Sequence, residues 1–286
     1  MRGAVPLITA APLMDLRCGV ELFVVETRLA FPGADGGDTH QEHSLTVLVL
    51  SNPDETSRRR LRAEVPRYVG ARTWIAEFPA DDWAGRVVEH LHALEPAFLD
   101  LVIGLQEPRD QAVLQVCHLL EQLRVEGRHH LGTLVAVASP EVARPATAEQ
   151  LGWVLAPQMP AAEGAMLLHA GLAQLSAPDL IEEVSAEDLA GVWGSAAQPA
   201  CLISADAGQL CHLPVWSARG RVAAFCLVSA QFGLYQAMVR DLSALGAENP
   251  LIVVAARLTL PGRAIEGWPC VIVTAAGRVG DVTKPS

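Results

Sequence analysis

Short apolar runs alternate with helical patterns along the first half of the chain. Leu45–Leu50 is a nearly continuous apolar run, of the kind that a strand buried on both faces of a sheet requires. Similar composition, bounded by turn-forming residues, predicts further strands at Glu21–Phe31, Arg72–Phe78, Leu99–Gly104, Gly132–Ser139 and Trp153–Pro157.

The segments between these strands have apolar residues at helical spacing. In Asp82–Leu94, for example, Trp83, Val87 and Leu91 recur on one helical face. Comparable patterns predict helices at Glu55–Val65, Pro108–Arg124 and Ala161–Leu175. Strands that alternate with helices in this way indicate a mostly parallel, Rossmann-like sheet covered on both faces.

The pattern changes in the second half, where strands follow one another with fewer helices. We expect helices at Ala186–Trp193 and Tyr235–Leu245, and strands at Pro199–Ser204, Arg221–Ala230, Pro250–Leu258 and Pro269–Ala276. This order is typical of a smaller α+β domain with a mixed sheet. The predicted organisation is therefore an α/β domain at 1–160, a central connecting helix at 161–177 and a C-terminal α+β domain at 178–286.

The charge balance argues against nucleic acid as a partner. The 286 residues carry a formal net charge of −11, and no broad basic surface is evident for phosphate neutralisation. The one basic cluster, Arg58–Arg60 with Arg62, lies on a predicted helix beside Glu55 and is interpreted as a solvated face. The single lysine, Lys284, is close to the end of the sequence, so we expect no P-loop, Schiff-base or general-base lysine.

Cysteine usage and hydropathy predict a cytoplasmic protein. The six cysteines form no CxxC pair and lie mostly in apolar runs, so they are interpreted as buried thiols in a reducing compartment. The N-terminal segment is weakly similar to a signal peptide, but Pro6 and Pro12 interrupt its apolar stretch. No apolar run reaches the length that spans a bilayer, and we expect no direct membrane insertion.

Common catalytic and metal motifs are missing from the sequence. It has no GxSxG, HExxH or Walker loop. Six of the nine histidines fall in close groups, but these do not combine with cysteines or carboxylates at ligand spacing, so no metal site is predicted. The six are His40, His43, His90, His92, His129 and His130.

A strand, loop and helix at Phe98–Leu123 have the order of a phosphate-binding unit without its chemistry. Such a loop needs small residues whose backbone N–H groups face one anion. Gly104 is instead followed by Leu105, Gln106, Glu107 and Pro108. The architecture is that of a nucleotide site, but the glycine cluster is absent.

The order of the segments resembles the tubulin and FtsZ superfamily. Gly171–Trp193 is similar to the FtsZ stretch that ends the central helix, and Arg221–Gly277 is similar to its C-terminal domain. Gly132–Pro140 resembles the strand whose Thr-Arg-Pro end contacts nucleotide. The resemblance covers residues 45–277, with Glu21–Phe31 as an addition, and implies an FtsZ/tubulin-like fold.

The two loops that bind GTP in that family differ here. Ser51, Asn52, Pro53, Asp54 and Glu55 replace the first glycine-rich loop, and Leu105–Arg109 replaces the second. Side chains with Cβ atoms block a phosphate, proline removes an N–H, and carboxylates repel an anion. We therefore expect no bound cofactor and a degenerate pocket, with loop residues Ser51, Asn52, Gly104, Gln106, Glu107 and Ser139.

The resemblance also implies an interface loop. In the family, acidic residues inserted from the next subunit support hydrolysis, and the matching position here is Val184 unless a one-residue shift brings in Glu183. The loop nevertheless carries Glu182, Glu183, Glu187 and Asp188, and is a candidate interface. The simpler interpretation is a solvated loop with carboxylates near a helix N-terminus.

These observations lead to three hypotheses. The first is an FtsZ-like protein, not an enzyme, that has lost GTP binding and hydrolysis and acts by self-assembly or by binding a filament-forming relative in a process such as cell division. The second is an enzyme or nucleotide-binding protein with a remodelled pocket that uses Asn52, Gln106, Arg109 and Ser139. The third is an unrelated α/β protein, which a structure without a helix at residues 161–176 would favour.

Overall fold

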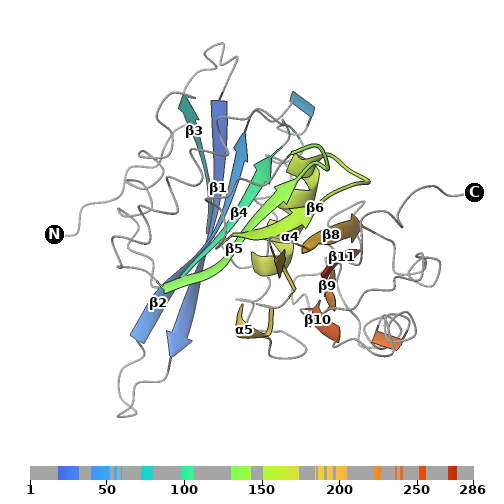
Figure 1. Ribbon diagram of the computed structural model, residues 1–286. Coiled ribbons are helices and arrows are strands. Elements are labelled where there is room, and N and C mark those ends of the chain that lie inside the picture. The colour runs from blue at the N-terminus through green and yellow to red at the C-terminus, as the bar shows by residue number, and fades with distance from the viewer. Residues whose placement is uncertain are drawn as a thin grey trace, which may run out of the picture.

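A computed structural model describes the strands, one long helix and several short segments of the chain. The described residues are 19–31, 40–51, 55–56, 59, 72–79, 98–105, 130–142, 151–173, 184, 186–189, 192–195, 198–204, 222–226, 236, 239–240, 251–255 and 270–275. Within them, the strands form a single eleven-stranded sheet with the order β10-β9-β11-β8-β6-β5-β4-β2-β1-β3, and β7 pairs with β8 outside this path (Figure 1).

The centre of this sheet is parallel and deeply buried. Five neighbouring strands run in the same direction: β2 (His40–Ser51), β4 (Phe98–Leu105), β5 (His130–Ala138), β6 (Gly152–Leu155) and β8 (Gln198–Ser204). Consecutive residues Val47–Leu50 point alternately to the two faces, yet each is at most 1% exposed. The predicted α/β class and the strand buried on both faces are therefore confirmed.

One antiparallel strand is inserted beside this parallel centre. β1 (Gly19–Phe31) pairs antiparallel with β2 along its length and antiparallel with β3 (Arg72–Pro79) from Gly19 to Glu26. β3 therefore runs parallel to β2 but does not touch it in the ladder. Beyond the reach of β3 and β4, the ends of β1 and β2 continue as a two-stranded ribbon (Figure 1).

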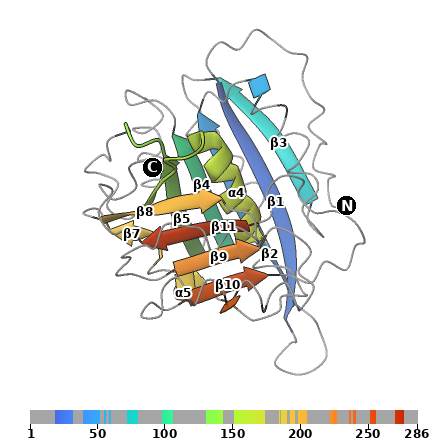
Figure 2. The ribbon, with the colours of Figure 1, turned by 90° about the vertical axis from the view of Figure 1, so that its right-hand side faces the viewer.

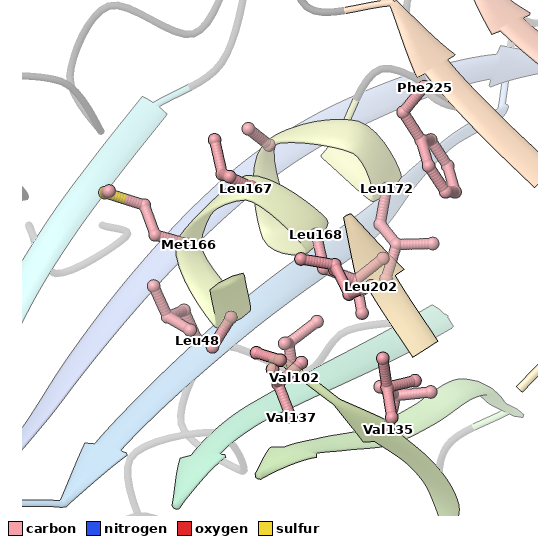
Figure 3. Close-up of a cluster of buried hydrophobic side chains, with 14 of the residues drawn as sticks. Leu48, Val102, Val135, Val137, Met166, Leu167, Leu168, Leu172, Leu202 and Phe225 are labelled. Atoms are coloured by element: carbon pink, nitrogen blue, oxygen red, sulfur yellow. The ribbon is translucent and has the colours of Figure 1, made fainter. Parts of the chain in front are cut away.

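Helix α4 (Ala161–Ala173) packs on one face of the sheet. Its residues are apolar or small almost all round, a composition typical of a helix inside a core rather than on a surface. From Ala161 to Leu172 only Glu163 is more than slightly exposed. Figure 3 shows Met166, Leu168 and Leu172 of α4 among Leu48, Val102, Val135, Val137, Leu202 and Phe225 of the strands.

The direction of the strands changes between β6 and β8, and α4 packs against strands on both sides of this change (Figure 2). β11 (Cys270–Ala275) is antiparallel to both β8 and β9 (Val222–Cys226), and β10 (Leu251–Ala255) is parallel to β9. Figure 2 shows these four strands crossing the direction of β4 and β5. Because α4 contacts β2, β4 and β5 as well as β9 and β11, it joins both parts of the sheet.

Two glycines let α4 approach strands β5, β8 and β9 closely. Gly164 and Gly171 are seven residues apart, so they lie on the same helical stripe. A Cβ atom on Gly164 would be 3.1 Å from Val137 Cγ1 and 3.4 Å from Leu202 Cδ2. A Cβ atom on Gly171 would be 2.6 Å from the Phe225 ring and 2.9 Å from its Cβ.

Most predicted strands are confirmed, with small changes at their ends. The helix predicted at Ala186–Trp193 is shorter in the structure, where α5 covers Ala186–Leu189. Val192 lies in a turn, and its N–H donates to the Leu189 carbonyl at 2.9 Å. The chain leaves the helix here because the Trp193 carbonyl accepts the Trp153 N–H at 3.1 Å, next to β7 (Gly194–Ser195). Leu105 also belongs to β4 rather than to the following loop.

Several other predictions fall partly or wholly outside the described residues. The predicted helices Asp82–Leu94 and Pro108–Arg124 lie outside them altogether. Glu55, Thr56 and Arg59 are helical, as predicted for Glu55–Val65, and Gln236, Val239 and Arg240 are helical within Tyr235–Leu245. The helix predicted at Ala161–Leu175 is confirmed as far as Ala173. The predicted division at residues 160 and 178 stays a prediction.

Gly171→Ala should destabilise the protein more than Gly164→Ala. Both changes gain about 1 kcal/mol of helix propensity. At Gly171 the new methyl overlaps Phe225 near its backbone, which costs roughly 1–3 kcal/mol, whereas the neighbours of Gly164 need move only a few tenths of an ångström. Urea unfolding of both variants measures the difference. Equal free energies of unfolding would mean that α4 does not press against β9.

Candidate functional site

The carboxyl edge of the parallel strands is where ligands bind in open α/β sheets. Here two backbone hydrogen bonds link neighbouring strand ends. The Ser139 N–H donates to the Leu105 carbonyl at 3.1 Å, and the Ala156 N–H donates to the Ala138 carbonyl at 3.0 Å. The ends of β4, β5 and β6 are therefore held together.

Three of the predicted pocket residues lie at this edge. Ser51 is the last residue of β2, and Ser139 directly follows β5. Gly104 lies in β4, paired with Leu50 on one side and Val137 on the other. Asn52, Gln106 and Glu107 fall outside the described residues. The structure thus brings Ser51, Gly104 and Ser139 to neighbouring strand ends, as expected for parallel strands.

Gly104 itself contributes to packing. As the predicted strand Leu99–Gly104 implies, it is a strand residue, and it lies beneath the first turns of α4. A Cβ atom on Gly104 would lie 2.6 Å from Leu50 Cδ2, 3.2 Å from Ala165 Cβ and 3.4 Å from Ala162 Cα. The missing side chain lets the helix sit directly on the sheet. Ala162 and Ala165 are at most 1% exposed, so this contact is part of the core.

Ser139 opens a short polar turn after β5. Its carbonyl accepts the Val142 N–H at 3.0 Å, and its hydroxyl donates to the exposed Glu141 carboxylate. This hydrogen bond is the main cause that lowers the pKa of Glu141 below its ordinary value of 4.5. Ser139 and Glu141 are therefore polar groups at the edge, already engaged with each other.

The acidic interface loop is only partly described. Val184 is half-buried and packs against the core, and Leu189 of α5 is fully buried. Between them Asp188 is exposed, while the side chains of Glu182, Glu183 and Glu187 are outside the described set. The two apolar residues fix this segment to the protein and leave a carboxylate at the surface.

A polar pair that the sequence patterns did not indicate lies on β4 and β5, where Thr133 is buried and Asp100 is half-buried. The Thr133 N–H donates to Asp100 Oδ1 at 2.6 Å, at a point where the register shifts and β5 has one extra residue between the partners of Leu99 and Leu101. Burial raises the pKa of the Asp100 carboxyl above its ordinary value of 3.8, and the Thr133 N–H opposes this shift. The sequence signal is a lone carboxylate within the apolar run 98–105.

The other ionisable groups of the described residues do not cluster as a metal site or a reactive centre would require. In the described part of the chain, no three His, Cys, Asp or Glu side chains gather as a metal ion would require. Burial raises the pKa of the Cys201 thiol to about 11, so this thiol is protonated at neutral pH. Arg59 approaches Glu55 at 3.7 Å, and both side chains are largely exposed, as predicted for this helix face; Arg58, Arg60 and Arg62 lie outside the described residues.

Together these features define an α/β protein whose parallel sheet is covered on one face by a buried helix. No known protein family matches the sequence, and no curated protein is significantly similar to it. Among the described residues, no helix is long and apolar enough to cross a membrane.

The raised pKa of Asp100 predicts a pH-dependent stability. A carboxyl whose pKa is higher in the folded state holds its proton longer there, so its contribution to stability falls as pH rises from about 3.8 through the folded pKa. Asp100→Asn removes this titration. The free energy of unfolding of the wild type minus that of the variant should therefore decrease with rising pH, measured by urea unfolding between about pH 3 and pH 7.

Glu141→Gln provides the control of opposite sign. The lowered pKa of Glu141 means that its contribution is present above about 4.5 and is lost as pH falls through the folded pKa. Because Glu141 is exposed, the effect should be small. A difference curve for Asp100→Asn that is flat, or that rises with pH, would contradict a raised pKa.

Proposed function

We propose that this chain is a divergent FtsZ/tubulin-like protein that neither binds nor hydrolyses GTP and that acts by assembly. Its partner is a second copy of the chain or a filament-forming relative. The proposal rests on the sequence resemblance over residues 45–277 and on the character of the carboxyl edge. We propose that α4 is the connecting helix of a two-domain organisation in which both domains pack against it and share its core.

The observation that carries the proposal is the close packing of Leu50 and of the α4 residues Ala162 and Ala165 around Gly104. This contact lies where a phosphate-binding loop would start, and a single methyl group on Gly104 would already be within 2.6 Å of Leu50 Cδ2. The residues around it, Ala162 and Ala165, have no hydrogen-bonding side chain. The apolar packing at Gly104 supports a protein that uses its surfaces rather than a nucleotide pocket.

The acidic segment supports an interface in the same proposal. Val184 and Leu189 fix it to the core, and Asp188 is exposed between them. An anchored segment loses little conformational freedom when a partner binds, which favours association. A basic side chain of the partner is the expected complement of these carboxylates.

Sedimentation velocity over a concentration series, with and without GTP and Mg²⁺, tests the proposal. We expect larger species that form equally in both conditions. Glu183→Gln combined with Glu187→Gln should weaken assembly several-fold, and Glu55→Gln, which changes an exposed carboxylate on another element, should not. A strict monomer in both conditions would contradict self-assembly and leave a heterologous partner.

A second candidate is a nucleotide- or small-molecule-binding enzyme with a remodelled pocket. The polar turn at Ser139 and Glu141 favours it, because these side chains lie at the edge where α/β proteins bind ligands. Assembly that occurs only with GTP would support this candidate over the first.

A further inference from the structure

Two cysteines far apart in the sequence are direct partners in the sheet. Cys226 is the last residue of β9, and Cys270 is the first residue of β11. The antiparallel register of these strands pairs Cys270 with Cys226, then Val271 with Phe225. The chain between the two cysteines includes β10, so their proximity arises only from the fold.

The backbone at this position suits a disulfide. Residues directly opposite in an antiparallel pair have Cα atoms about 4.5–5.5 Å apart and lie on the same face of the sheet. Disulfides span Cα separations of roughly 4.4–6.8 Å, a range that includes the separations found in an antiparallel pair. The register therefore places the Cα atoms of Cys226 and Cys270 at a separation that a disulfide can span, with both strands in their present positions.

Cys201 on the neighbouring strand is in a different position. Its partners in the ladder are Thr274 of β11 and Leu155 of β6, neither of which is a cysteine. Burial also raises the pKa of its thiol to about 11, which disfavours the thiolate that attacks disulfides. Of the cysteines in described strands, only Cys226 and Cys270 are opposed.

We propose that Cys226 and Cys270 are a reversible dithiol–disulfide pair that locks β9 to β11 when it is oxidised. The oxidant is a low-molecular-weight disulfide such as glutathione disulfide. One cysteine thiolate attacks it and forms a mixed disulfide, releasing one glutathione thiolate. The second cysteine thiolate then attacks the protein sulfur of that bond, forming Cys226–Cys270 and releasing the second glutathione thiolate.

The reaction transfers two electrons from the protein to glutathione disulfide. The two protein thiols lose two protons and two electrons, and one glutathione disulfide becomes two thiols. In a reducing compartment the same steps run backwards, so the pair stays as thiols there and becomes bonded only under oxidation. The bond closes a loop of more than 40 residues, which restricts the unfolded chain and stabilises the fold.

Peptide mapping of the oxidised wild-type protein tests the pair directly. The protein is incubated with glutathione disulfide, the remaining thiols are alkylated in denaturant, and the product is digested with trypsin. Cleavage after arginine gives peptides 222–240 and 264–278, each with one cysteine. We expect these two to be linked in the product from folded protein, and linked in much lower yield when oxidation is carried out in urea.

Variants give a second measurement that does not depend on the mapping. Oxidation should raise the Tm of the wild type by roughly 4–12 °C, and dithiothreitol should reverse the shift. Cys201→Ser should keep this shift, and Cys270→Ser should abolish it. If peptides 222–240 and 264–278 from folded protein instead carry alkylated thiols or separate glutathione adducts, the inference is wrong.

Discussion

The packing of α4 across the bend of the sheet is the interaction on which the rest of the structure depends. One stripe of the helix, with Ala162 and Ala165, rests on β2 and β4, and another, with Gly164 and Gly171, meets β5, β8 and β9. The Trp193 ring stacks on Phe225 with centroids 6.4 Å apart and closes this core. In the ladder of described strands, the two parts of the sheet meet at the short pairing of β6 with β8, and α4 packs across this junction.

The same packing reaches the carboxyl edge of the sheet. The first turns of α4 lie against Gly104, the second-to-last residue of β4, so apolar contacts fill this face of the sheet close to the strand end. Among the described polar groups near this edge, Ser139 and Glu141 bond to each other. A carboxylate beside the edge further disfavours an anionic ligand.

Local patterns predicted the strands well because burial on both faces leaves continuous apolar runs, as at Leu45–Leu50. They also predicted α4, whose apolar residues leave no polar face. Features that depend on pairing between distant strands were not predictable: the insertion of β1 between β2 and β3, the bulge beside Asp100, and the register that opposes Cys226 to Cys270. Of the candidate site, strand order predicted that Ser51, Gly104 and Ser139 share an edge, but the packing role of Gly104 required the position of α4.

The packing described above requires that α4 and both parts of the sheet form one cooperative core. Native-state amide hydrogen exchange can measure this, because it resolves the free energy of opening for separate segments. We expect amides of Ala165–Leu172, Leu101–Ile103 and Ala223–Phe225 to exchange only through global unfolding, with equal opening free energies and equal dependence on urea. If β9 exchanged through a separate opening while α4 and β4 stayed protected, the two parts would not share a core.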